Sequence, residues 1–306
     1  MKSFLTGIIP VLETPFHPDG EIDIEGFVSL VDHVSGTGVV AVAFPGFASE
    51  FHKLSGPERD VLVTCVLERL SHRADIGTVV TVADHATVLA VKAAERAAAA
   101  GADVINVIPP YFLGPAPSAV AAHLSAVLAA VSPVPVIVQH SPALTGLSLS
   151  IDELADLAAQ HTNFRAVKVE STPPGPMVTA LAQTTPPLGA LVGYGGLHML
   201  DALRRGALGT QPGCSFTEIY VAIWGAWSSG DTQAAEELHR RLLPYVAYWM
   251  QGVELIVQAE KTISMRRGLI RSDHCRTPGR NLDRFELETV DRFLAEFAEI
   301  LAGPNC

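Results

Sequence analysis

The feature that most constrains this 306-residue chain is a repeated alternation of two kinds of segment. Short apolar runs alternate with longer segments whose apolar residues recur at helical spacing, which is typical of a parallel sheet buried on both faces. The runs of strand length are 8–12, 39–44, 76–83, 104–108, 135–139, 164–170, 188–193 and 207–210. Eight such units predict a closed (β/α)₈ TIM barrel rather than an open doubly wound sheet.

Helices are expected between and after these runs. Segments of helical period lie at 24–34, 87–100, 151–159 and 197–205, and then at 216–229, 232–250, 253–268 and 284–302. Ser55 before Pro57 and Asp231 before Ala234 are N-cap signals. Because no linker or composition shift interrupts the chain, we expect a single domain over 1–306. Within it, 1–230 form the barrel and 231–306 form an additional C-terminal helical layer.

Composition excludes several classes of protein. Apolar residues make up 48% and charged residues 17%, so a large core is available. The 21 basic against 32 acidic residues give a net charge of −11, which argues against nucleic acid or an anionic membrane as the main partner. No apolar run reaches the roughly 18 residues of a membrane span, and the start lacks a signal peptide. Four cysteines without metal-ligand spacing favour a cytoplasmic protein with reduced thiols.

Lys168 is the sharpest chemical signal, since it interrupts an otherwise apolar strand in a fold whose chemistry lies at strand C-termini. Side chains alternate along a strand, so Lys168 and Glu170 share one face while Val167 and Val169 share the other. Lys168 therefore points into the barrel. Burial disfavours a charged ammonium and favours the neutral amine that attacks a carbonyl. The alternative is a structural ion pair with Glu170, about 7 Å further along the strand.

Several motifs in a fixed order extend this interpretation along nearly the whole chain. They are Thr14-Pro15-Phe16, Asp19-Gly20, Ile22-Asp23, Gly46-Phe47-Ala48-Ser49-Glu50, Leu54-Ser55, Glu58-Arg59, Pro109-Pro110-Tyr111, Pro142, Thr145-Gly146, Lys168, Arg205-Gly206-Ala207-Leu208-Gly209, Lys261, Gly268-Leu269-Ile270 and Arg276-Thr277-Pro278. In this order they resemble the dihydrodipicolinate synthase/N-acetylneuraminate lyase family of class I aldolase-type barrels.

The resemblance implies that Lys168 forms an imine with a 2-oxo acid, typically pyruvate. It implies lyase chemistry without a cofactor or metal, because the protonated imine is itself the electron sink, and a homodimer or homotetramer. The family's turn at Gly46 to Ser49 binds the substrate carboxylate. We carry this role over to the backbone amides of Phe47 and Ala48, with Ser49 in the same turn. Glu50 matches a structural glutamate.

The chain departs from the family where the family's proton relay stands. The relay's threonine corresponds to Phe47, its strand-five tyrosine to Gln139 and its second tyrosine to Phe112. Leu144 replaces the arginine with which dihydrodipicolinate synthases bind a substrate carboxylate. We therefore do not expect authentic dihydrodipicolinate synthesis. Phe47 and Phe112 narrow the pocket for an apolar tail of the substrate, or merely fill space.

Other residues are candidates for the missing roles. Glu170 is the first choice as proton shuttle, or else it only neutralises Lys168. Gln139 orients a carbonyl or hydroxyl but does not transfer protons. His140 contacts substrate or is a hydrogen-bonded loop histidine. Gly193 leaves room beside the Lys168 imine, and Tyr194 donates a phenolic proton or is an exposed loop tyrosine.

Three other functions stay open at this stage. A phosphate-binding barrel would use the glycine-rich segment 193–196 before a helix. A metal-dependent lyase would use Glu13, Asp84, His85, His140 and Glu170. A non-catalytic barrel would bind a 2-oxo acid after losing its relay. The sequence leaves open the substrate and the choice between aldol cleavage, condensation and dehydration.

Overall fold

The computed structural model describes residues 4–302 and contains a parallel eight-stranded barrel. The strands are β1 Gly7–Ile8, β2 Ala41–Phe44, β3 Gly77–Val82, β4 Val104–Val107, β5 Val136–His140, β6 Phe164–Val169, β7 Gly189–Val192 and β8 Gly209–Thr210. Each strand pairs with the next in the order β1-β8-β7-β6-β5-β4-β3-β2. A bridge between Val11 and Ala43 joins the two ends of this series, and the predicted (β/α)₈ barrel is confirmed.

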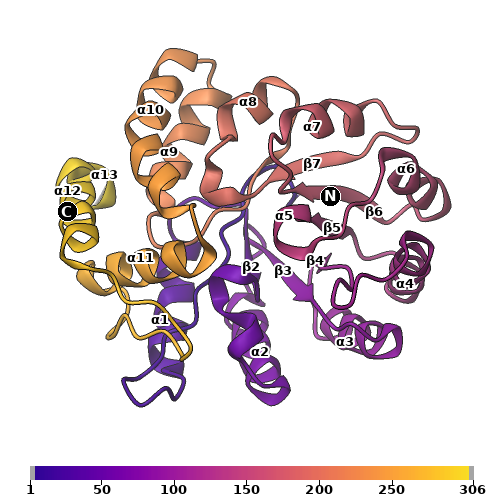
Figure 1. Cartoon of the computed structure of the whole chain (residues 1–306), viewed down its shortest axis with the longest axis horizontal. Coiled ribbons are helices and arrows are strands. Elements are labelled where there is room, and N and C mark those ends of the chain that lie inside the picture. The colour runs from indigo at the N-terminus through magenta and orange to yellow at the C-terminus, as the bar shows by residue number, and fades with distance from the viewer. Residues whose placement is uncertain (1–3, 303–306) are drawn as a thin grey trace.

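Helices surround the strands (Figure 1). They are α1 Ile24–Ser35, α2 Gly56–Leu70, α3 Thr87–Ala99, α4 Pro117–Ala130, α5 Pro142–Thr145, α6 Ile151–Gln160, α7 Gly175–Ala182, α8 Met199–Arg204 and α9 Thr217–Ser228. Three short 3₁₀ turns are η1 Phe47–Ser49, η2 Phe51–Lys53 and η3 Tyr194–Gly196. The C-terminal helices α10 Thr232–Trp249, α11 Val253–Arg266, α12 Arg284–Glu296 and α13 Ala298–Leu301 gather on one side of the barrel, at the left of Figure 1.

Local sequence signals explain several of these boundaries. The Ser55 hydroxyl accepts the amide of Glu58, and the Glu58 carboxylate accepts the amide of Ser55, so the expected cap of α2 is present. Asp231 caps α10 by accepting the amide of Ala234.

The strand β1 ends before the expected residue 12 because Pro10 follows it and carries no amide for a ladder. The strand β8 ends at Thr210 as expected but begins only at Gly209, since the Ala207 amide donates to the carbonyl of Ala202 in the preceding helix.

One expected helix is divided. The segment 284–302 reads as a continuous helix in the sequence, but the structure ends α12 at Glu296 and begins α13 at Ala298. Phe297 between them leaves helical geometry and is buried against Phe293, with the two ring centroids 5.2 Å apart. Tertiary packing of this ring overrides the local helical preference.

Apolar side chains fill the interior of the barrel away from the C-terminal ends of the strands. This packing limits where a site can lie. A cluster inside the strands is formed by Leu5, Ile9, Val11, Ala41, Ala43, Val79, Val104, Ile137, Ala166 and Leu191. A second, larger cluster lies between the strands and the helices. Space for a ligand is therefore left at the C-terminal ends of the strands, as in other barrels of this kind. None of the helices within residues 4–302 has the length and apolar character needed to cross a bilayer.

Candidate active site

Lys168 lies inside the barrel near the C-terminal end of β6. In the ladder it stands opposite Gln139 of β5 and Leu191 of β7. Only 5% of its surface is exposed. Its Nζ atom lies 3.5 Å from Oε1 of Glu170, whose side chain is also buried. The alternation along the strand thus brings the amine and the carboxylate to one inward face, and side-chain reach closes the expected gap between them.

The Glu170 carboxylate is held by two donors on β5 and the residue after it. Gln139 Nε2 donates to Oε2 of Glu170 at 2.7 Å, and the Ser141 hydroxyl donates to the same oxygen. The other oxygen, Oε1, faces Lys168. One oxygen is therefore fixed by hydrogen bonds while the other is directed at the amine.

Gln139 belongs to a polar row that crosses three strands. Asn106 Nδ2 on β4 donates to the Gln139 side-chain oxygen at 3.1 Å and to the Thr81 hydroxyl on β3 at 3.2 Å. Because its oxygen is occupied, the Gln139 amide is oriented with its NH₂ group toward Glu170. Sequence reasoning missed Ser141, Asn106 and Thr81. Asn106 was detectable, since it is a lone amide within the apolar run 104–108.

The turn from Gly46 to Ser49 is anchored to the barrel wall by its last residue. The Ser49 hydroxyl donates to the carbonyl of Leu12 and accepts the amide of Gly46 at 3.0 Å. Thr14 donates to the Ser49 carbonyl at 2.8 Å. Ser49 is fully buried and does not line the cavity described below. Its role in the structure is to hold the turn.

The amides of Phe47 and Ala48 stand at the start of η1. The first N–H groups of a helix have no partner within it, whereas the amides of Ser49 and Glu50 already donate to carbonyls of the turn. Phe47 and Ala48 also line the cavity that contains Lys168. The turn therefore presents two backbone donors beside the amine.

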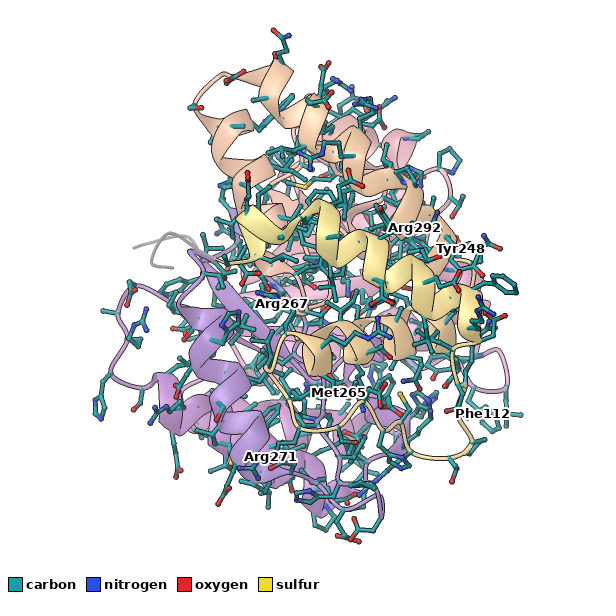
Figure 2. All side chains as sticks on the ribbon, turned by 90° about the vertical axis from the view of Figure 1, so that its left-hand side faces the viewer. Phe112, Tyr248, Met265, Arg267, Arg271 and Arg292 are labelled. Atoms are coloured by element: carbon teal, nitrogen blue, oxygen red, sulfur yellow. The ribbon has the colours of Figure 1, made fainter. Side chains whose placement is uncertain are left out.

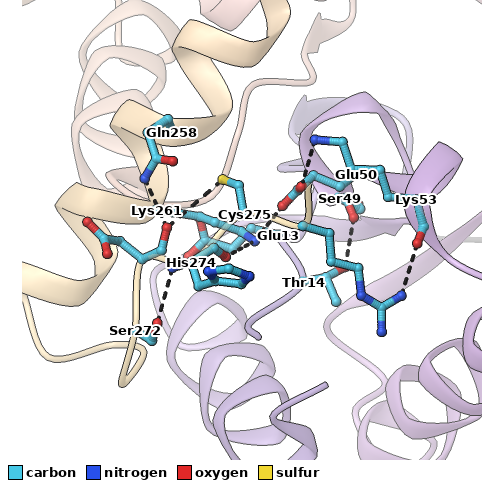
Figure 3. A network of polar contacts seen from close by, with 12 residues as sticks. Glu13, Thr14, Ser49, Glu50, Lys53, Gln258, Lys261, Ser272, His274 and Cys275 are labelled. Atoms are coloured by element: carbon cyan, nitrogen blue, oxygen red, sulfur yellow. Dashed lines mark hydrogen bonds and ion pairs between the residues drawn. The ribbon is translucent and has the colours of Figure 1, made fainter. Parts of the chain in front are cut away.

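Glu50 and Lys261 fix the turn from behind (Figure 3). Glu50 adopts a left-handed backbone conformation with φ of 53°, and its Oε1 lies 2.5 Å from Nζ of Lys261. Its other oxygen pairs with Lys53 at 3.1 Å. Both oxygens of the Glu50 carboxylate are thus paired with lysines that do not line the cavity, in keeping with the structural role expected for Glu50.

Gly193 leaves room for the Glu170 carboxylate, which faces Lys168. A Cβ at this position would lie 2.0 Å from Oε1 of Glu170. The next residue, Tyr194, has a left-handed backbone with φ of 52° and lines the cavity. Burial raises the pKa of the Tyr194 phenol, so its hydroxyl stays protonated at neutral pH.

These groups surround one small cavity of about 70 Å³ at the C-terminal end of the barrel. Its lining comprises Val11, Phe47, Ala48, Leu144, Lys168, Glu170, Tyr194, Gly195, Gln211, Pro212, Gly213, Met250, Val253, Ile256, Val257 and Glu260. Lys168 is the single cation among these lining residues. Helix α11 supplies Glu260, which the sequence analysis did not single out. No signal in the sequence separates it from the other polar residues of α11, because only the folded structure shows that every residue from Leu255 to Ser264 is buried.

Four residues expected to bind substrate do not line this cavity: Ser49, Gly193, Phe112 and His140. Phe112 is 72% exposed and projects from the edge of the molecule (Figure 2). His140 is buried at the end of β5, where its Nε2 atom accepts the amide of Leu149 at 3.3 Å. Burial lowers the pKa of His140, which keeps the ring neutral at pH 7.

The residues considered for a metal are not assembled. Within residues 4–302, no three His, Cys, Asp or Glu side chains form a group able to bind a metal ion. A larger cleft, of about 350 Å³, lies outside the strands against α2 and α3 and is lined by Arg59, Asp60 and Arg96. It contains none of the residues predicted for catalysis or substrate binding.

The sequence profile of the dihydrodipicolinate synthetase family matches residues 4–297. The chain belongs to this family. Its similarity to a 4-hydroxy-tetrahydrodipicolinate synthase of Streptomyces coelicolor is 32% identity over 296 residues, covering 94% of this chain and 92% of that protein. A probable 2-dehydro-3-deoxy-D-pentonate aldolase of Escherichia coli is 29% identical over 254 residues, covering 81% and 83%.

Solved structures of the family agree with this assignment. The crystal structure of YagE from E. coli in complex with pyruvate is 26% identical and superposes with a TM-score of 0.87 over 96% of this chain and 98% of that one. Relatives of both the synthase and the aldolase kind place the chain among enzymes of the lyase type, with class I aldolase-like chemistry.

Proposed function

We propose that the protein is a Schiff-base-forming lyase that acts on pyruvate or a pyruvate-derived 2-oxo acid, and that Lys168 is its nucleophile. One observation carries the proposal: a buried amine and a carboxylate 3.5 Å away lie in one cavity with two backbone amides of η1. Enzymes that use a lysine in this way need the amine, a proton shuttle and a binding group for the substrate carboxylate.

In this mechanism the amides of Phe47 and Ala48 bind the carboxylate of the 2-oxo acid. Glu170, which has taken a proton from the Lys168 ammonium, donates it to the ketone oxygen as the neutral amine attacks the ketone carbon. The Glu170 carboxylate then accepts a proton from the nitrogen and passes it to the same oxygen, which leaves as water. In cleavage, the bond between the methyl-derived carbon and the next carbon of the substrate breaks. The iminium on Lys168 accepts the electron pair of this bond. Gln139 and Ser141 orient Glu170 throughout, so no cofactor is required for the proton transfers.

We further propose that the substrate is not that of a dihydrodipicolinate synthase. Leu144 lines the cavity at the position where those synthases have an arginine, and the cavity lining supplies no cation besides Lys168. A second substrate carboxylate would find no partner there. The homodimer or homotetramer expected from the resemblance stays a prediction.

Reductive trapping tests the nucleophile directly. Borohydride with pyruvate is expected to leave a stable adduct on the Lys168 peptide of the wild type, detected by mass spectrometry. Lys168→Ala is expected to give no adduct and no turnover, with the circular dichroism of the native fold. Lys92→Ala, which removes an exposed amine on α3, is the matched control and should trap normally. An adduct in Lys168→Ala would refute the assignment.

The same experiment separates the enzyme from a binding barrel. A wild type that binds 2-oxo acids but is never trapped, across a panel including pyruvate, 2-oxobutyrate and 2-oxoglutarate, would favour a non-catalytic binding function. Turnover that is lost on chelation of metals and restored by a divalent cation would favour the metal-dependent alternative.

A further inference from the structure

Glu260 is a buried residue that lines the cavity near the end of β8. It lies on α11 and is 3% exposed, and it lines the cavity together with Lys168 and Glu170. Its carboxyl group lies against the backbone of Gly213, where an added Cβ would meet Oε2 of Glu260 at 1.7 Å. Only glycine at position 213 admits this carboxyl group at the strand end.

A second polar group beside Glu260 lacks a protein partner. Gln211, at the end of β8, is 4% exposed and lines the same cavity. Within residues 4–302 its Nε2 atom has no hydrogen-bond acceptor. A buried donor left unpaired costs about 1–3 kcal/mol, so an acceptor on a bound ligand fits this place.

Burial, with a second carboxyl group nearby, keeps the Glu260 carboxyl group neutral. Burial, followed by the nearby Glu13 carboxyl, raises the pKa of Glu260 to about 8. The titratable groups that face it are Glu13 at the end of β1, Cys214 after β8 and Tyr220 on α9, with Lys168 and Glu170 on the cavity wall. At neutral pH Glu260 is thus a hydrogen-bond and proton donor rather than a carboxylate.

We propose that Glu260 is the general acid for the second substrate. This substrate is a carbonyl compound whose carbonyl carbon forms, or in the reverse reaction breaks, a bond with the methyl-derived carbon of pyruvate. Glu260 protonates the oxygen on that carbonyl carbon. Gln211 donates a hydrogen bond to the same substrate oxygen. The proposal rests on the imine chemistry proposed above and adds to it a separate acid, so that Glu170 serves the imine and Glu260 serves the distal oxygen.

The chemical step balances without another reagent. In condensation, the enamine carbon on Lys168 attacks the aldehyde carbon and a carbon–carbon bond forms. The π electron pair of the aldehyde moves to its oxygen, which takes the proton of Glu260, and water then releases the product from the lysine. In cleavage the same proton returns from the hydroxyl to Glu260 as the bond breaks.

The arrangement also selects the aldehyde by charge. Glu170 and Glu260 both line the cavity, Lys168 is committed to the imine, and the remaining wall near α11 is formed by apolar side chains such as Ile256 and Val257. A carboxylate or phosphate on the aldehyde would be buried without a counter-charge. The inferred partner of pyruvate is therefore an uncharged aldehyde.

The experiment combines pyruvate trapping with condensation. Wild type, Glu260→Gln and Glu254→Gln are first tested for borohydride trapping of pyruvate. They are then tested for condensation of pyruvate with glycolaldehyde, D-glyceraldehyde or benzaldehyde, and with glyceraldehyde 3-phosphate or succinic semialdehyde. Glu254→Gln is the matched control, because Glu254 lies on the same helix but pairs with Lys53 and does not line the cavity.

Glu260→Gln is expected to trap pyruvate like the wild type and to condense uncharged aldehydes on the order of 100-fold more slowly. The fall in wild-type rate above about pH 8 should disappear in this variant. Equal condensation rates and pH profiles in wild type and Glu260→Gln would overturn the inference. So would a wild type that traps pyruvate but reacts with no uncharged aldehyde, or prefers the charged ones. A wild type that never traps pyruvate refutes the proposed function itself, and the inference with it.

Discussion

Two buried lysines in this protein have different surroundings: Lys261 contacts only protein groups, whereas Lys168 lies beside a cavity. Lys261 on α11 is fully buried, and its Nζ atom contacts Oε1 of Glu50 at 2.5 Å and the carbonyl of His274 at 2.9 Å, with the Phe16 ring centroid 4.3 Å away. Lys168 is 5% exposed and has, within residues 4–302, one ion-pair partner at 3.5 Å and a cavity beside it.

The difference teaches that burial alone does not make an amine a nucleophile. The Nζ atom of Lys261 is already engaged by Glu50, the His274 carbonyl and the Phe16 ring, and its side chain is fully buried, so no substrate has access to it. Lys168 keeps one side open to a ligand, and its neighbour Glu170 is positioned to exchange a proton with it. An amine that is incompletely satisfied and faces a cavity is the one suited to chemistry.

The largest expected effect is the loss of activity in Lys168→Met. If activity were kept, the contrast between Lys168 and Lys261 would be wrong. Lys168→Met should reduce turnover and pyruvate trapping to background. Its free energy of unfolding should fall less than that of Lys261→Met, because Glu170 keeps the hydrogen bonds from Gln139 and Ser141. Activity assays and urea denaturation check both halves. Residual trapping on another lysine, above all Lys261, would show that burial by itself suffices.

Lys261→Met should produce the opposite pattern. Removing one partner of a buried ion pair leaves the Glu50 carboxylate without its main counter-charge, which costs about 3–5 kcal/mol of stability. Urea denaturation measures this loss, with the exposed Lys92→Met as control. If the variant still folds, its trapped fraction per folded molecule should approach that of the wild type. A stability equal to that of the wild type would contradict the structural role.

Gly193→Ala tests whether the position of the Glu170 carboxylate beside Lys168 matters for catalysis. Its Cβ would lie 2.0 Å from Oε1 of Glu170 and must displace that carboxylate. Misplacing a catalytic group in this way should lower the rate of turnover about 100-fold. Steady-state kinetics measure the effect, and Gly225→Ala on α9, where a Cβ meets nothing within 4 Å, is the control. Equal rates in wild type and Gly193→Ala would remove Glu170 from the mechanism.

On α11, where Glu260 precedes Lys261, the pH dependence of the free energy of unfolding tests whether Glu260 is protonated in the folded state. Burial raises the pKa of Glu260 to about 8 from 4.5, so between those values the folded state holds a proton that the unfolded state has lost. The free energy of unfolding should therefore fall as pH rises through this window, by about 1.4 kcal/mol per pH unit for this group.

Urea denaturation at pH 5.5, 6.5 and 7.5 should show this decline in the wild type and a shallower one in Glu260→Gln. Some decline should remain below about pH 6, because burial also raises the pKa of Glu13 to about 6. Identical slopes in the two proteins would mean that Glu260 is ionised in the folded state.

Much of the barrel could be predicted from the sequence, because strand and helix periods are local properties. The eight apolar runs indicated the eight strands, and the caps at Ser55 and Asp231 began helices where expected. The break at Phe297 was not predictable in this way. It depends on a ring that packs against residues on other helices.

The site was predictable only in part for the same reason. Alternation along 164–170 sufficed to put Lys168 and Glu170 on one inward face. The hydrogen bonds to Glu170 from Gln139 and Ser141 join neighbouring strands, and the row through Asn106 to Thr81 spans two more. Such contacts depend on register and rotamer, which no single run of sequence specifies.

The amino-acid sequence by itself determined the barrel, the buried lysine and the family, because periodicity, strand parity and ordered motifs are written along one dimension. Only the tertiary structure decided that Glu260 joins the cavity, that Ser49 anchors its turn from outside the cavity, and that Gly193 makes room for a carboxylate. These facts depend on distances between segments far apart in the chain, and only the folded packing of strands and helices sets those distances.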